Sequence, residues 1–147
     1  MGRAASPRPA PATRVQDVMT REVVTLAPTQ PFQEAITVLA KRRFHHVLVA
    51  DAQRTLLGVI SDRDLLRFMV GQTWESAVVG DVMVTDPVSV QPEDLLSTAC
   101  ETMIARRINC LPGVDEAGRI VGILTSTDLL KAYMGLQAEI EKDGRAA

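Results

Sequence analysis

Two segments of the sequence place a hydroxyl group three positions before a carboxylate, each after an apolar run. The first pairs Ser61 with Asp64 and the second pairs Thr125 with Asp128. Because a helical pattern follows each run, we expect a strand to pass directly into a helix N-terminus at both places. Unpaired backbone N–H groups and the helix dipole favour an anion there, and a hydroxyl can reach a phosphate oxygen. A carboxylate displaced around the helix can accept hydrogen bonds from a ribose diol, so the pattern suits a nucleoside phosphate.

The same spacing is also typical of a capping box, in which the two side chains only satisfy the first backbone donors of the helix. A cap and a ligand site can share the same residues. Two features favour a site in addition to a cap. The junction occurs twice, and Gly58 and Gly122 each precede the hydroxyl by three residues, which leaves room for close backbone approach. We therefore expect at least one junction to bind a nucleotide.

The two junctions belong to an internal duplication. An offset of 64 residues aligns Asp17-Val18-Met19 with Asp81-Val82-Met83, and the alignment continues without a gap to Arg67 and Lys131. Of the 53 aligned positions, 14 are identical, which exceeds chance and identifies two copies of one unit. Each copy is too small to bury its apolar face alone, so we expect the copies to pack together.

The periodicity predicts the same order of elements in both copies: strand, helix, strand, strand, helix. In the first copy these are residues 23–26, 32–42, 46–50, 56–60 and 61–69; in the second they are 88–90, 96–103, 110–114, 120–124 and a helix from Ser126. The fold class is therefore α/β (α+β). We place a disordered Ala- and Pro-rich tail at 1–14, the repeats at 15–75 and 76–134, and a helical tail at 135–147.

The composition excludes several classes of partner. The 147 residues carry 16 Lys and Arg against 18 Asp and Glu, so nothing favours nucleic acid or an acidic membrane surface. No apolar run approaches the roughly 20 residues of a spanning helix, and the N-terminus lacks the apolar core of a secretory signal. We expect a soluble, cytoplasmic protein. Cys100 and Cys110 have no second pair with which to form a metal site and are interpreted as reduced, packed thiols.

These motifs together resemble tandem CBS domains, named after cystathionine β-synthase, two of which form a Bateman module. The resemblance rests on the Asp-Val-Met openings, the strands before Pro28 and Pro92, the strand end Leu111–Asp115, and the two Gly-x-x-Ser/Thr-x-x-Asp-Leu-Leu junctions. It covers residues 15–134. It implies a pseudo-twofold pair with two clefts between the copies, binding of AMP, ADP, ATP or S-adenosylmethionine there, and pairing of modules into a homodimer.

The resemblance also implies roles for residues at the junctions. Asp64 and Asp128 match the ribose-binding Asp, and Ser61 and Thr125 match the phosphate-facing hydroxyls. The residues just before each Asp would lie at the rim; these are Arg63 and Thr127.

Two histidines distinguish the first copy from the second. His45 and His46 fall where family members often place His or Arg against phosphate, whereas the second copy has Asn109 and Cys110. The two clefts should therefore differ in charge. The pair could also be merely surface-exposed or half-packed, and it lacks the third donor that a metal site needs nearby. The sequence departs from the family pattern at Leu48, where Pro is usual, and at Gly113, where Val is usual.

Three functions are compatible with parts of this pattern to different degrees. A ligand sensor would bind an adenine nucleotide between the copies and signal by a change of shape to an unidentified effector protein. A constitutive dimerisation scaffold would leave the clefts empty. An enzyme is disfavoured, because the sequence has no phosphate-binding Gly-rich loop, no cluster of metal ligands and no motif that pairs a nucleophile with a base.

Overall fold

The computed structural model describes residues 13–146 except residues 43 and 72, and its elements follow the duplication. Repeat one contains the short 3-10 helix η1 (Val15–Asp17), β1 (Thr25–Leu26), α1 (Phe32–Arg42), β2 (His46–Ala50), β3 (Leu56–Ser61) and α2 (Asp62–Gly71). Repeat two contains η2 (Val79–Asp81), β4 (Val84–Thr85), α3 (Leu96–Arg106), β5 (Cys110–Val114), β6 (Ile120–Thr125) and α4 (Ser126–Ala146). The expected α/β fold class is confirmed.

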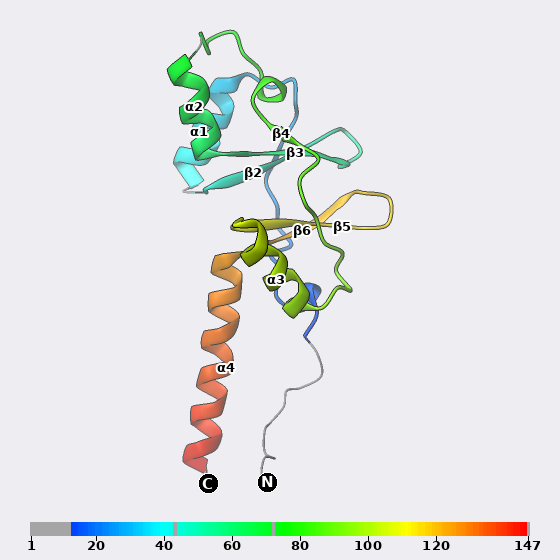
Figure 1. The fold of residues 1–147 in the computed structure, drawn as a ribbon, viewed down its shortest axis with the longest axis vertical. Helices are drawn as coiled ribbons and strands as arrows, with labels where there is room; N and C mark the ends of the chain where they lie inside the picture. Colours follow the sequence, from blue (N-terminus) through cyan, green and yellow to red (C-terminus); the bar gives the residue numbers. More distant parts are fainter. Residues whose placement is uncertain (1–12, 43, 72, 147) are drawn as a thin grey trace.

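The strands form two small sheets in the middle of the molecule, with α1 and α2 at one end and α3 and α4 at the other (Figure 1). One sheet has the order β1-β2-β3-β4 and the other is the β5-β6 hairpin. Strand β4 belongs to repeat two, yet it pairs with β3 of repeat one, opposite Gly58 and Val59. In return, Thr20 of repeat one pairs with Ile123 in β6 of repeat two. Each repeat thus contributes its opening segment to the sheet of the other.

The first strand of each repeat differs from the sequence-based expectation. Residues 23–26 form a strand only at Thr25–Leu26, and residues 88–90 make only an isolated parallel bridge from Val90 to Gly113. Repeat two forms a strand at Val84–Thr85 that the sequence did not predict; it corresponds to Thr20 and Arg21 of repeat one, and it forms because this segment reaches the free edge of β3. Local apolar patterns cannot reveal pairing with the other repeat.

The helix ends also refine the expected boundaries. Ser61 is the last residue of β3, and α2 begins at Asp62. Helix α4 continues without a break from Ser126 to Ala146, so residues 135–146 extend the last helix of repeat two (Figure 1). The sequence predicts a disordered tail at residues 1–14. Residues 1–12 lie outside the described residues, whereas Thr13 O accepts a hydrogen bond from Leu96 N at 2.9 Å and Arg14 pairs with Leu95. Within the described part of the chain, no helix is both long enough and apolar enough to cross a membrane.

The exchange of opening segments fills both hydrophobic cores. Val79 is fully buried among Phe32 and Ile60 of repeat one, whereas Val15 and Met19 are buried in the core of repeat two. The backbone repeats the arrangement. Val79 N donates to Gln30 O at 2.8 Å, and Val15 N, 64 positions earlier, donates to Asp94 O at 2.9 Å.

A third apolar cluster joins the two sheets. Leu48 and Ala50 of β2 are buried against Ile120 of β6. The hairpin tips are also paired, since Leu56 N donates to Gly118 O at 3.0 Å and Ile120 N donates to Arg54 O at 2.9 Å. The two repeats therefore share one continuous interior.

The two junction glycines accommodate the exchanged segments. A Cβ atom on Gly122 would lie 2.6 Å from the Sδ of Met19 and 3.0 Å from the backbone oxygen of Thr20. A Cβ atom on Gly58 would lie 2.7 Å from the backbone oxygen of Val84. The close approach that these glycines permit is therefore between segments of the chain and not to a ligand.

Candidate ligand site

The junction of repeat two forms a capping box at the start of α4. Thr125 N donates to Asp128 Oδ2 at 2.8 Å, and the Thr125 hydroxyl donates to the same oxygen at 3.0 Å. Asp128 N donates back to Thr125 Oγ1 at 3.2 Å. The capping box therefore holds the Asp128 carboxylate in a fixed position relative to the end of β6, with or without a ligand.

The junction of repeat one has the same local geometry. Ser61 N donates to Asp64 Oδ2 at 2.9 Å, and Asp64 N donates to Ser61 Oγ at 3.1 Å. The capping interpretation therefore applies at both junctions, and the surroundings of each carboxylate must decide whether it has a second role.

A cleft of about 320 Å³ opens beside Asp128, between the two repeats. Its apolar wall comes mainly from repeat one; the residues are Val23, Val24, Phe44, Leu48 and Ile123. The end of β6 and the N-terminal turns of α4 line the rest of it with Thr125, Ser126, Thr127, Asp128 and Lys131. A volume of this size lies at the lower end of the range for small-molecule sites, about 300–1,000 Å³.

The structure separates the eight candidate residues into two groups. Five of them line this cleft: His45, His46, Thr125, Thr127 and Asp128. The other three, Ser61, Arg63 and Asp64, lie at the junction of β3 and α2 and do not line it. The two junctions have the same sequence pattern, but only the junction of repeat two borders this cleft.

The two histidines occupy different environments. His46, in β2, is half-buried, and burial lowers its pKa, so the ring is neutral at neutral pH. The His45 side chain is exposed, and its Nδ1 lies 3.1 Å from Oδ2 of Asp62 at the start of α2. This hydrogen bond lowers the pKa of the Asp62 carboxyl. The positions that correspond in repeat two behave differently, since Asn109 lines the cleft whereas Cys110 is buried, with its pKa raised to about 11 by burial.

Five polar residues of the cleft were not among the candidates from the sequence: Thr20, Glu22, Asn109, Ser126 and Lys131. The Thr20 hydroxyl donates to Asp128 Oδ1 at 2.8 Å across 108 positions of sequence. Lys131 could have been found, because it lies one helical turn after Thr127 and thus on the same face. Thr20 and Glu22 could not, because their place depends on the exchange of opening segments.

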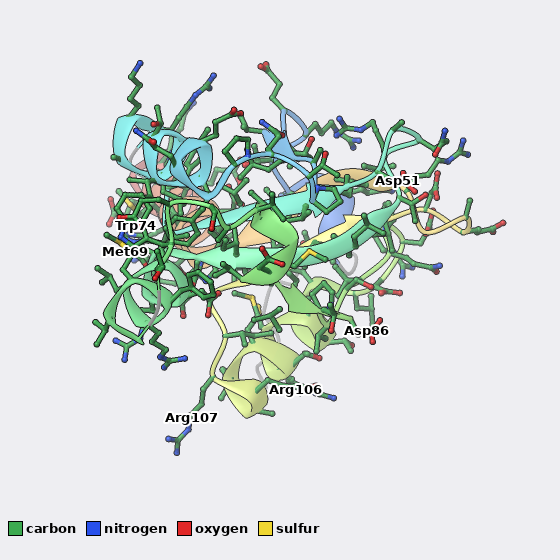
Figure 2. All side chains as sticks on the ribbon, turned by 90° about the horizontal axis from the view of Figure 1, so that it is seen from above. Asp51, Met69, Trp74, Asp86, Arg106 and Arg107 are labelled. Atoms are coloured by element: carbon green, nitrogen blue, oxygen red, sulfur yellow. The ribbon has the colours of Figure 1, made fainter. Side chains whose placement is uncertain are left out.

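Arginines end both α1 and α3. Among the described residues, Arg42, Arg106 and Arg107 do not line the cleft. Arg107 caps α3 in the left-handed conformation, and Figure 2 shows its side chain directed away from the body of the protein, with Arg106 nearby. This placement suits stabilisation of the helix C-terminus. Across the described residues, no group of three or more His, Cys, Asp or Glu side chains is arranged to hold a metal ion.

Comparison with known families accounts for both repeats. The CBS domain family matches residues 15–71 and 79–135. The chain belongs to this family. Among solved CBS-pair structures, AcuB from Vibrio cholerae is 32% identical, with a TM-score of 0.83 over 89% of this chain and 97% of that one. CBSX2, a CBS-pair protein of Arabidopsis thaliana, is 29% identical in its complex with AMP, with a TM-score of 0.76 over 84% of this chain and 98% of that one.

Curated CBS-containing relatives are longer. The inosine-5'-monophosphate dehydrogenase of Methanocaldococcus jannaschii is 33% identical over 132 residues, which are 90% of this chain but 26% of the dehydrogenase. An uncharacterized protein of the same organism is 30% identical, and the chain spans 41% of it. The matched region is the CBS pair, which occurs in these relatives as part of a larger protein.

Proposed function

We propose that this CBS pair is a regulatory module that binds an adenosine-containing ligand in the cleft at Asp128. The observation that carries the proposal is the cleft itself, in which an apolar wall from one repeat faces a carboxylate and a helix N-terminus from the other. An adenine ring suits the apolar wall of Val23, Leu48 and Ile123, and a ribose diol suits the acceptor oxygens of Asp128.

The phosphate of such a ligand would lie toward the first turn of α4. The positive end of the helix dipole there favours an anion, although the N–H groups of Ser126 and Asp128 already donate to Asn109 O and Thr125 Oγ1. Lys131 adds a positive charge on the same helix face, and His46 borders the cleft from β2. The volume of about 320 Å³ suits a nucleoside with a short phosphate chain, so the further phosphates of ATP would extend into solvent.

Relatives support an adenosine ligand. CBSX2 is solved in complex with AMP and has 29% identity to this chain. AMP, ADP, ATP and S-adenosylmethionine all share the adenosine group that the proposed site would hold.

Isothermal titration calorimetry of these four ligands, with matched Asp variants, tests the proposal. Asp128→Ala should weaken the best ligand by about 10- to 150-fold, the scale for losing hydrogen bonds to a charged group. Asp64→Ala removes the same kind of capping box but lies outside the cleft, so it should leave the affinity within about twofold. Both variants should show a similar, modest loss of thermal stability, because both lose a cap.

Two results would contradict the proposal. If none of the four ligands binds at millimolar concentration, the chain is a scaffold without a ligand. If Asp64→Ala and Asp128→Ala weaken binding equally, the site is not the cleft at Asp128.

A second function, self-association, is favoured by exposed apolar residues on the terminal helices of both repeats. Leu66 and Val70 of α2 are 63% and 89% exposed, and the residues 64 positions later in α4, Leu130 and Met134, are 65% and 68% exposed. Next to α2 lies an apolar groove of about 410 Å³, which Leu66 lines together with residues of α1. We propose a homodimer in which these matching helix faces meet those of a second copy.

Sedimentation of the wild type and of Leu66→Glu tests the homodimer. The variant should sediment as a monomer, whereas the matched Thr37→Glu, on an exposed position of α1, should leave the dimer intact. A wild-type monomer at micromolar concentration would overturn the dimer and leave the ligand proposal standing.

A further inference from the structure

The hydrogen bond from Thr20 to Asp128 is a contact that the duplication does not explain. Thr20 precedes β1 in repeat one, and its backbone is held on β6 of repeat two by two hydrogen bonds with Ile123, each of 2.9 Å. Its hydroxyl donates to Asp128 Oδ1 at 2.8 Å. Both residues line the cleft. A rigid backbone pairing therefore holds the Thr20 hydroxyl beside the carboxylate.

A count of donors and acceptors defines what this corner of the cleft can bind. A threonine hydroxyl has one hydrogen, and Thr20 uses it on Asp128. Asp128 Oδ2 already accepts from the backbone and the hydroxyl of Thr125. What Thr20 Oγ1 and Asp128 Oδ1 still offer to the cleft is acceptor lone pairs only. A ligand must present donors to these two atoms, so two adjacent hydroxyl groups fit here and the phosphate must lie away from Asp128 Oδ1.

The other junction lacks this arrangement. The position that corresponds to Thr20 is Val84, which has no hydroxyl and is paired in β4 with β3. Among the described residues, the Asp64 carboxylate accepts a hydrogen bond only from Ser61 N. The acceptor pair is therefore a property of the Asp128 side alone.

We propose that Thr20 is a specificity-determining residue: with Asp128 it forms an acceptor pair that selects ligands with a vicinal diol. The inference rests on the proposed binding of a nucleotide at this cleft. Thr20 accepts a hydrogen bond from one ribose hydroxyl while its own hydrogen keeps the Asp128 carboxylate turned toward the other. The opening segment of repeat one thereby completes the sugar-binding corner of repeat two.

The test compares AMP with 2',3'-dideoxy-AMP by calorimetry on four proteins. The wild type should prefer AMP. Thr20→Val should weaken AMP by about three- to tenfold, the scale of one lost hydrogen bond, and should leave dideoxy-AMP unchanged, because that ligand never used the contact. Thr20→Ser should retain the preference. Thr37→Val, a matched change on an exposed position of α1, should behave as wild type.

The pattern of affinities separates the possible failures. If the Thr20→Val variant loses affinity for both ligands equally, Thr20 only shapes the cleft and the inference is wrong. If the variant keeps the full preference for AMP, Thr20 makes no contact with the sugar, and the inference is again wrong while the proposed ligand site stands. If the wild type binds neither nucleotide, the proposed function falls and the inference falls with it.

Discussion

Gly122→Ala tests the exchange of opening segments directly. The new Cβ atom would lie 2.6 Å from the Met19 Sδ and 3.0 Å from the Thr20 backbone oxygen, both closer than normal contact. The methionine end can move, but the Thr20 oxygen cannot, because it accepts a 2.9 Å hydrogen bond from Ile123 N. We therefore expect the opening segment to be pushed off β6.

The magnitude follows from overpacking, which typically costs about 1–3 kcal/mol. At roughly 4 °C per kcal/mol for a chain of this size, the melting temperature should fall by about 4–12 °C. Urea unfolding followed by circular dichroism measures the free energy of unfolding. AMP affinity should fall as well, because displacing Thr20 disturbs its 2.8 Å hydrogen bond to Asp128.

The matched control is Gly135→Ala. Gly135 lies inside α4, and a Cβ atom there would meet nothing within 4 Å. Alanine is the better helix former by about 1 kcal/mol, so this variant should be more stable than wild type. If Gly122→Ala were as stable as Gly135→Ala, Met19 and Thr20 could not lie where the structure places them, and the exchange would be refuted.

Three further outcomes are expected. Burial lowers the folded-state pKa of His46 below its unfolded value of about 6.5, so the unfolded chain binds more protons and stability should fall from about pH 7 to pH 5; His46→Gln should reduce this loss, and a loss of the same size in that variant would contradict this. Because burial raises its pKa to about 11, Cys110 should resist iodoacetamide at pH 8 until the protein unfolds, and equal labelling of half-buried Cys100 and Cys110 would contradict this. Phe32→Ala, at a position 1% exposed, should cost about 3–5 kcal/mol in urea unfolding, and a loss below 1 kcal/mol would refute its place in the core.

The sequence was sufficient for the repeat and for most element positions. Apolar runs located β2, β3, β5 and β6 to within a residue, because β2 and β5 are buried almost throughout and β3 and β6 alternate buried with partly buried apolar residues. The 64-residue offset established the duplication without structural information. The first strands were predicted too long, since only Thr25–Leu26 and the bridge of Val90 form, and the strand Val84–Thr85 was not predicted, because it is determined by the sheet edge it reaches and not by its own composition.

The candidate site shows where sequence reasoning ends. Hydroxyl and carboxylate spacing located Asp64 and Asp128 equally well, since the local geometry of both junctions is the same capping box. The difference between them arises from residues far away in sequence, above all Thr20 at one junction and Val84 at the other. The alignment of the two repeats already shows Thr20 opposite Val84. Only the exchange of opening segments shows that the Thr20 side chain lies beside the carboxylate of the other repeat.

The exchange also affects how the chain responds to a cut. A protease that cleaves once between the repeats, near Thr73, would leave Val79 inside the core of the first fragment and Val15 inside that of the second. The two fragments would stay together as a folded complex. The first fragment alone would lack Val79 and strand β4, and the second alone would lack Val15 and the bridge from Thr20 to Ile123. A single repeat should therefore not fold on its own, and the chain can be expressed as two separate pieces only if both are present together.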